Sequence, residues 1–269
     1  MLNHTQPFNN VFPCKKPLIG MIHLPPLPGR DGFRGMDVVL KKARKDLHTL
    51  QAAGFDGALV ENDDDRPPRF IDPRHPEPDD RITNEMMHVM RALMQETDLP
   101  LGLEIIYDML GTVEVAHAVG AQFVRLDVFV DDVRTVEHGQ REMYAPADVI
   151  LRRMQELKAS NLLLLTDVQV KHTTMIDAKK TLQQSTQEAI TASSAAVIVT
   201  GTWTAKSPDL DACQQVKTAT AERVPVIIGS GLKLQNAASL LRIADGAIVG
   251  SSIKTKAGYI SPTKARELV

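Results

Sequence analysis

The chain lacks the features that mark several common classes of protein. Its 269 residues contain one tryptophan and two cysteines, Cys14 and Cys213. Two thiols so far apart match neither a disulfide framework nor a compact zinc motif, so we expect free thiols in a reducing compartment. No apolar run approaches the ~18 residues of a membrane-spanning helix. We therefore expect a soluble, intracellular (cytoplasmic) protein without a membrane span.

An excess of charge of one sign is also missing. The formal net charge is −2 at pH 7, so no overall positive field would hold a nucleic acid, and no nucleic-acid partner is expected. Residues 1–16 contain no arginine and no apolar core of a secretory signal. We expect them to form an arm that is poorly ordered or covers one end of the fold, ahead of one domain over residues 17–269.

Strand-like and helix-like segments alternate from Pro17 onward. Predicted strands cover 18–24, 57–62, 101–106, 123–128, 162–168, 196–201, 225–228 and 246–249, and predicted helices cover 36–53, 84–97, 112–119, 145–159, 178–192, 208–221, 236–244 and 261–268. Eight βα units predict an α/β protein with a parallel sheet closed into a single (β/α)8 TIM barrel. A doubly wound open sheet is the alternative, but its glycine fingerprint should follow the first strand, where His23-Leu-Pro-Pro stands instead.

Two of these strands end in small residues one βα unit apart. The two loops are Gly229-Ser230-Gly231 and Gly250-Ser251-Ser252, and Gln235 or Asn236 is placed to cap the helix between them. Glycine lets backbone N–H groups approach an anion, serine adds a hydroxyl donor, and a helix N-terminus adds partial positive charge. The pair of loops therefore predicts a phosphate site after strands seven and eight of the barrel. The alternative is that small residues simply make tight turns.

Polar residues at the carboxyl ends of barrel strands face one shared mouth, where barrel enzymes carry their chemistry. Glu61 and Asp167 are candidate general acids or bases, and His172 is a candidate proton shuttle. Lys171 is a candidate to neutralise an oxyanion or to form a Schiff base. The other polar residues of the mouth are His23, Asn62, Asp63, Glu104, Asp108, Arg125 and Asp127. Arg125 and Asp127 are spaced to face one side of a strand, so an internal ion pair is their structural alternative.

No cofactor is indicated with certainty, but a divalent metal is an open alternative. Barrel closure can bring distant ligands together, and the candidate set is His23, Glu61, Asp167 and His172. The connection over residues 63–80 is long, acidic and rich in proline, which excludes regular structure and is typical of a lid or of a solvated charged excursion.

Several motifs carry a resemblance to a known family. They are KPLIGMIHLPPLPG (16–29), GALVEN (57–62), VGAQFVR (119–125), DVQVKH (167–172), VTG (199–201) and VIIGSG (226–231). With these motifs the chain resembles the BtpA/SgcQ family from Lys16 to its C-terminus. The resemblance implies a TIM barrel close to the phosphate-binding barrels. Members usually carry a polar RND-type sequence after the third strand, where this chain has Tyr107-Asp108-Met109, so chemistry that needs that arginine or asparagine is altered here.

Two classes of function remain open. The first is an enzyme, an isomerase, lyase or hydrolase, that acts by acid–base chemistry on a phosphorylated small molecule such as a sugar phosphate or a nucleoside-like ester. The second is a non-catalytic assembly or stability factor, because the family takes its name from a cyanobacterial role in the accumulation of photosystem I. An exposed apolar patch outside the mouth would favour the second class. A homo-oligomer is compatible with both.

Overall fold

The computed structural model describes residues 7–66, 68–76 and 82–269 and contains a closed, all-parallel barrel. Its strands, in order around the barrel, are β1 (Leu18–His23), β11 (Gly246–Val249), β10 (Val226–Ile228), β9 (Ala196–Val199), β7 (Leu163–Asp167), β4 (Phe123–Leu126), β3 (Leu101–Glu104) and β2 (Gly57–Glu61). First and last strands pair, with Leu18 opposite Ala247. The predicted TIM barrel is confirmed, and the doubly wound alternative is wrong.

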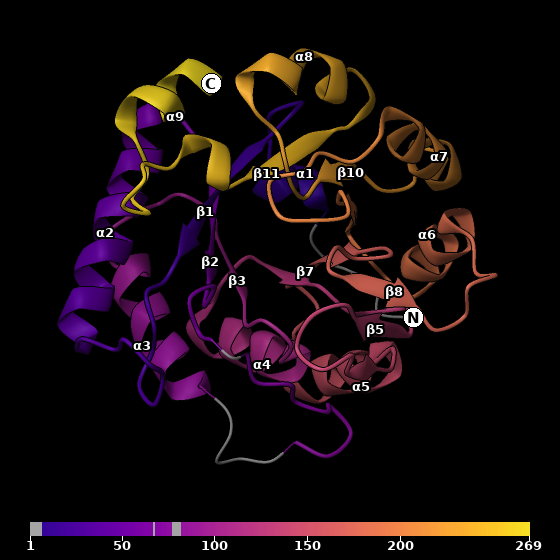
Figure 1. Ribbon diagram of the computed structural model, residues 1–269, viewed down its shortest axis with the longest axis horizontal. Helices are drawn as coiled ribbons and strands as arrows, with labels where there is room; N and C mark the ends of the chain where they lie inside the picture. The colour runs from indigo at the N-terminus through magenta and orange to yellow at the C-terminus, as the bar shows by residue number, and fades with distance from the viewer. Residues whose placement is uncertain (1–6, 67, 77–81) are drawn as a thin grey trace.

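Helices form a ring outside the strands, as Figure 1 shows. They are α2 (Met36–Ala53), α3 (Thr83–Met94), α4 (Met109–Val119), α5 (Ala147–Leu157), α6 (Leu182–Thr191), α7 (Leu210–Thr220), α8 (Leu234–Ile243) and α9 (Pro262–Leu268). Gly54 ends α2 in the left-handed conformation, with φ of 91°, as its position after the apolar pattern predicts. The N-cap of α8 is Lys233 and neither predicted residue, but Asn236, in the first turn, takes part in the cap by accepting a hydrogen bond from the Lys233 N–H at 2.8 Å.

Alternation along each strand divides the side chains between two cores. Outward residues pack against the helices, whereas inward residues fill the barrel with the apolar cluster Ile19, Met21, Leu59, Phe123, Leu163, Leu165, Ala196, Ile198, Ile227 and Ile248. Gly102 makes room for one of them, since a Cβ there would lie 2.1 Å from the Phe123 ring. Two residues further along β2, β4 and β7, the inward positions become Glu61, Arg125 and Asp167, so the polar mouth lies directly above an apolar floor.

The amino ends of the strands are covered by the start of the chain. Residues 1–6 of the predicted arm lie outside the described residues, but α1 (Phe8–Val11) and Phe12 join the inner cluster. Phe12 is 1% exposed and meets the Phe123 ring edge-on, with ring centroids 5.3 Å apart. It also contacts Gly57, the first residue of β2. These contacts place α1 at the end of the barrel opposite the mouth.

A small antiparallel sheet, absent from the sequence-based prediction, is built from the connections after β4 and β7. It consists of β6 (Glu142–Met143), β5 (Val133–Thr135) and β8 (Thr173–Met175), in that order. Of the long 63–80 connection, residues 67 and 77–80 lie outside the described residues. Its described part is anchored by a hydrogen bond from the Ile71 N–H to the Tyr107 carbonyl at 3.0 Å and by stacking of Phe70 on Tyr107.

Two expectations about bulk properties can be compared with the described residues. Within them, no helix combines the length and the apolarity that crossing a membrane requires. Both cysteines are free thiols, Cys14 on the surface and Cys213 in the core.

Candidate functional site

A cavity of about 200 Å³ lies at the carboxyl ends of the strands. It is lined by the loops after β10 and β11 and by side chains at or after the ends of other barrel strands. The predicted site residues that line it are His23, Glu61, Asp63, Arg125, Lys171, Gly229, Ser230, Gly231, Gly250, Ser251 and Ser252. A wider cleft of about 760 Å³ adjoins this cavity and shares His23, Asp63, Thr204 and Ser251 with it.

Six predicted residues lie outside this lining, namely Asn62, Glu104, Asp108, Asp127, Asp167 and His172. Asn62 accepts a hydrogen bond from the Ile106 N–H at 2.9 Å, and Asp108 caps α4 by accepting from the Gly111 N–H at 2.7 Å. Both are structural. Asp127 and Asp167 are buried beneath the cavity, and His172 points to the loop after β9.

Arg125 is the centre of the polar layer below the cavity. Its guanidinium donates to both carboxylate oxygens of Asp167, at 2.7 and 3.0 Å, and to Glu104 at 3.4 Å. Arg125 therefore does not form the ion pair with Asp127 that was the predicted alternative. It pairs instead with carboxylates on the two adjacent strands, β7 and β3. Burial opposes the charge of Arg125, but Asp167 and Glu104 raise its pKa well above the ordinary value. Because both oxygens of Asp167 are taken by Arg125, this residue is poorly placed to exchange protons with a ligand.

Glu61 and Glu104 face each other as register partners on β2 and β3. Burial raises the pKa of both carboxyls, and the charge of Glu104 raises that of Glu61 further. Arg125 acts in the opposite direction on Glu104. The pKa of Glu61 is raised to about 8 and that of Glu104 to about 7. The pair therefore keeps a proton near neutral pH and can both donate and accept one.

His23 and Asp63 form a second polar pair on the cavity wall. The His23 Nδ1 lies 3.2 Å from the Asp63 Oδ2. Burial favours the neutral form of Asp63, yet His23, with help from Arg66 and Lys254, holds the pKa of this carboxyl below its usual range. Lys254, which sequence reasoning missed, lines the adjoining cleft. Burial and the charge of Lys42 lower the pKa of Lys254 to about 8. Its place two residues after the second glycine loop was the available signal.

The two glycine loops differ in how many of their polar groups already form hydrogen bonds within the protein. A Cβ at Gly231 would lie 2.1 Å from the Ser207 backbone nitrogen, and the Ser230 hydroxyl already donates to the Lys206 carbonyl and accepts from the Gly201 N–H. This first loop is thus fastened to residues 201–207.

The second loop retains free polar groups. It leads into the short helix η2 (Ser251–Ile253), whose first N–H groups have no partner within the helix. The Ser252 Oγ is buried and has no hydrogen-bond partner in the described structure. Unpaired buried hydroxyls are costly, and the Ser252 hydroxyl is therefore a donor that this loop leaves unused.

His172 fastens the loop after β9 rather than lining the cavity. Its Nε2 accepts from the Thr204 backbone N–H at 3.2 Å and lies 2.8 Å from the Thr204 hydroxyl, while its ring meets Trp203 edge-on at 4.9 Å. Burial, followed by the charge of Lys171, lowers the pKa of His172. Because Thr204 lines the cavity, His172 acts on the site by holding this loop in place.

The structure groups the predicted metal ligands differently from the sequence. Within the described residues, one set of His, Asp and Glu side chains brings its ligand atoms within 4.8 Å of one another, and it consists of His23, Glu61 and Asp63. Asp167 is bound to Arg125 and His172 to Thr204, so neither joins His23 and Glu61.

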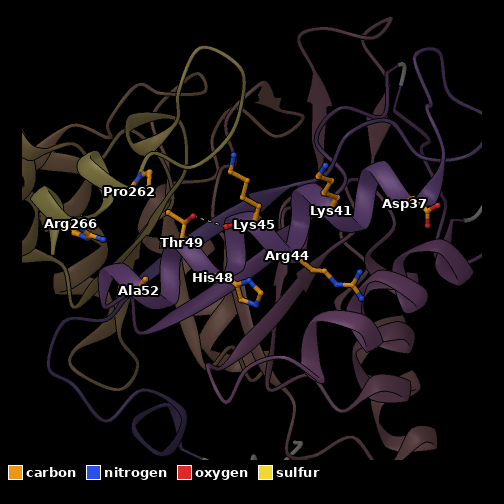
Figure 2. A pocket seen from close by; sticks show the side chains of 9 residues that line it. All are labelled: Asp37, Lys41, Arg44, Lys45, His48, Thr49, Ala52, Pro262 and Arg266. Carbon is orange, nitrogen blue, oxygen red and sulfur yellow. Dashed lines mark hydrogen bonds between the residues drawn. The ribbon is translucent and has the colours of Figure 1, made fainter.

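A separate groove of about 660 Å³ lies on the outside of the barrel between α2 and α9. Figure 2 shows the basic side chains Lys41, Arg44, Lys45, His48 and Arg266 around it. Several are already engaged: Arg44 pairs with Glu96 at 2.6 Å, and the Lys45 ammonium lies 4.5 Å from the centre of the Tyr259 ring. None of the residues that line this groove lines the cavity at the strand ends, where barrel chemistry is assembled.

Fold and site together define a TIM barrel with a polar cavity between paired glycine loops and buried carboxyls. The BtpA family model matches residues 14–269, and the chain belongs to that family. It is 35% identical to an uncharacterized protein of Thermococcus kodakarensis, over 95% of this chain and 94% of that one. It is 30% identical to the photosystem I biogenesis protein BtpA of Synechocystis, over 90% and 82%. Among solved structures, thiamine phosphate pyrophosphorylase from Pyrococcus furiosus shares the fold, with a TM-score of 0.58, 16% identity and coverage of 94% and 93%.

Proposed function

We propose that the protein is an enzyme that binds a phosphorylated small molecule in the mouth cavity and acts on it by acid–base chemistry. One observation carries the proposal: Glu61 and Lys171 line the same cavity as both glycine loops. A ligand held by its phosphate at the glycine loops would therefore lie in the same cavity as the side chains of Glu61 and Lys171. The cavity of about 200 Å³ is smaller than the roughly 300–1,000 Å³ of sites for drug-sized ligands, which favours a small metabolite such as a sugar phosphate.

Each polar group has a role in this proposal. The Ser251-Ser252 backbone N–H groups and the Ser252 hydroxyl hold the phosphate as hydrogen-bond donors. The Glu61–Glu104 pair moves a proton, since its members share one in a site shielded from water. Lys171 neutralises negative charge that develops on the substrate. Arg125 and Asp167 hold Glu104 from below, as positioning residues.

Related proteins supply independent support. The structural neighbour from Pyrococcus furiosus carries the name of an enzyme for a phosphate compound, and paired loops after the last two strands are the usual phosphate site of such barrels. The identity is low, so this neighbour supports the class of ligand and leaves the reaction to be found by experiment.

Phosphate binding is tested by a thermal-shift titration with inorganic phosphate and a panel of sugar phosphates. We expect binding to raise the midpoint of unfolding, because the ligand binds only the native state. Ser252→Ala should weaken binding by roughly tenfold or more, since a hydrogen bond to a charged group contributes about 1.5–3 kcal/mol. The matched control is Ser239→Ala on α8, whose hydroxyl donates within its own helix. Equal thermal shifts in wild type and Ser252→Ala would show that phosphate does not bind at this loop.

Catalysis is tested separately with Glu61→Gln. This variant should still bind the phosphorylated ligands that stabilise wild type, but it should lose turnover of any compound that wild type converts. The second candidate function, a non-catalytic assembly factor, rests on the name of the Synechocystis relative. It predicts no stabilisation by any phosphorylated compound and no turnover, so the same two assays decide between the candidates.

A further inference from the structure

We propose that His23, Glu61 and Asp63 form a binding site for a divalent transition-metal ion in the cavity wall. Their ligand atoms lie within 4.8 Å of one another. His23 and Glu61 are register partners on the adjacent strands β1 and β2, and Asp63 follows β2 by two residues. The barrel thus fixes two of the three ligands on rigid strands, which is the arrangement that holds a ligand geometry most firmly.

The distribution of charge around these residues favours a cation. Glu61 adjoins Glu104 on the next strand, and Asp127 and Asp167 are also buried. Of these four carboxyls, Arg125 bonds to Glu104 and Asp167. Buried carboxylates are costly unless they are paired or coordinate a metal. A divalent ion between His23, Glu61 and Asp63 would supply positive charge at the edge of this layer.

The site also adjoins the loop that we assign to phosphate. The Nε2 atom of His23 would lie 3.5 Å from a Cβ placed on Gly250, so the histidine ring borders the Gly250–Ser252 loop directly. Three protein ligands leave coordination positions open, as catalytic metal sites require. Binding of the metal does not rest on the proposed function. A Glu61 carboxylate that ligates the ion is ionised, so the metal-bound form and the form in which Glu61 holds a proton are alternative states of this side chain.

The ligand types indicate which ion to expect. An imidazole nitrogen with two carboxylates suits Mn²⁺, Fe²⁺ or Zn²⁺, while Mg²⁺ and Ca²⁺ prefer sites made of oxygen alone. Lys254 is close enough to act electrostatically on both Glu61 and Asp63. Lys171 acts likewise on Glu61 and Arg66 on Asp63. An incoming ion would compete with these positive charges.

The test is a titration of the full, tag-free, chelator-treated chain with Mn²⁺, followed by electron paramagnetic resonance. We expect one bound ion per chain with nitrogen hyperfine coupling from His23. The variants Asp63→Asn and His23→Gln should each weaken binding by roughly tenfold or more, because loss of even an outer-shell partner costs about 10–100-fold. Zn²⁺ should displace Mn²⁺, while Mg²⁺ and Ca²⁺ at equal concentration should not.

The chain offers a matched control. On the surface, His75 and Asp72 form a pair with the same Nδ1–Oδ2 distance of 3.2 Å as His23 and Asp63. Asp72→Asn should leave Mn²⁺ binding unchanged. If Asp63→Asn and wild type bind equally, or if wild type shows no nitrogen coupling, the site is wrong. If circular dichroism shows that His23→Gln does not fold, the nitrogen coupling of wild type and the Asp63→Asn titration still test the proposed metal site.

Metal and phosphate binding can fail separately. The metal titration is run without phosphate, and the phosphate titration of the preceding section is run with chelator present. Metal binding without any phosphate binding would overturn the proposed function and keep the metal site. Phosphate binding without metal binding would overturn the metal site and keep the proposed function.

Discussion

Glu61 and Glu104 are the residues on which the proposed chemistry depends, because a shared proton is what allows one group to act as acid and base. The pair exists only because two strands bring their carboxyl ends together in register. Either glutamate alone on an apolar strand would be a buried charge with no compensation. The proton that the pair holds has a measurable consequence for stability.

We predict that Glu61→Gln becomes more stable relative to wild type as the pH rises from 5 to 9. The pKa of Glu61 is raised above its ordinary value of 4.5, first by burial and then by Glu104. A raised pKa means that the folded state binds the proton more tightly, so the contribution is full below pH 4.5 and is lost as the pH rises through the folded-state pKa. Glutamine does not ionise, so the variant does not lose stability at this position as the pH rises.

Thermal unfolding in chelator-containing buffers across this pH range measures the difference. Glu267→Gln, at an exposed position of α9, is the control and should show a difference independent of pH. A Glu61→Gln difference that is also flat would mean that Glu61 is ionised in the folded protein at all these pH values.

At the scale of elements, the connection after β9 shapes the cavity although it contains no regular structure. Residues 201–207 cover Gly231, and Thr204 and Ala205 line the cavity. His172 and Ser230 hold this connection from two sides, through Thr204 and the Lys206 carbonyl respectively. The accepting role of His172 requires its Nε2 to be unprotonated, so protonation would release one side of the loop.

We predict that the fluorescence of Trp203, the one tryptophan of the chain, changes as the pH falls below 6.5. Burial lowers the pKa of His172 from its ordinary value of 6.5. A lowered histidine pKa contributes stability above pH 6.5 that is lost as the pH falls through the folded-state value. The imidazolium then loses its contact with the Thr204 N–H, and Trp203, 4.9 Å away, reports the change.

A pH titration of the emission of wild type and His172→Gln measures this effect. Glutamine can still accept a hydrogen bond but does not titrate, so the transition should vanish in the variant while far-ultraviolet circular dichroism stays constant in both. A transition of the same size in His172→Gln would assign the signal to another group.

At the scale of the whole molecule, the eight βα units were predictable because each buried strand is a short apolar run bounded by turn residues. The match is closest where a glycine ends the run, as for β11 at residues 246–249. The third strand was predicted two residues too long, because Ile105 and Ile106 continue the apolar run but already belong to the turn before α4, where Thr112 binds the Ile105 N–H.

The contacts within the site were less predictable, because they depend on which strands become neighbours. Sequence spacing joins Arg125 to Asp127, whereas the barrel joins it to Asp167, 42 residues later. Likewise, the Ser230 hydroxyl forms its hydrogen bonds with residues of another loop, Gly201 and Lys206. The small β6-β5-β8 sheet was not predicted from the sequence, because strands of two or three residues carry no periodic pattern.

Closure of the barrel joins the two ends of the chain, and one buried side chain marks the junction. Asp46 on α2 is fully buried and accepts from the Lys42 ammonium at 2.6 Å and from the Ile260 N–H at 2.8 Å, across 214 residues of sequence. We predict that Asp46→Ala destabilises the whole barrel by about 3–5 kcal/mol, because it leaves the buried Lys42 charge without its carboxylate.

Urea unfolding followed by far- and near-ultraviolet circular dichroism measures the loss. Asp37→Ala, in the exposed first turn of the same helix, should cost no more than the roughly 0.3–1 kcal/mol of a helix-dipole interaction. Both probes should give one shared midpoint, since β1 pairs with β11 and neither end of the chain completes the barrel without the other. Separate midpoints in Asp46→Ala would instead show that the C-terminal segment unfolds by itself, which would make the Asp46 contact a local anchor.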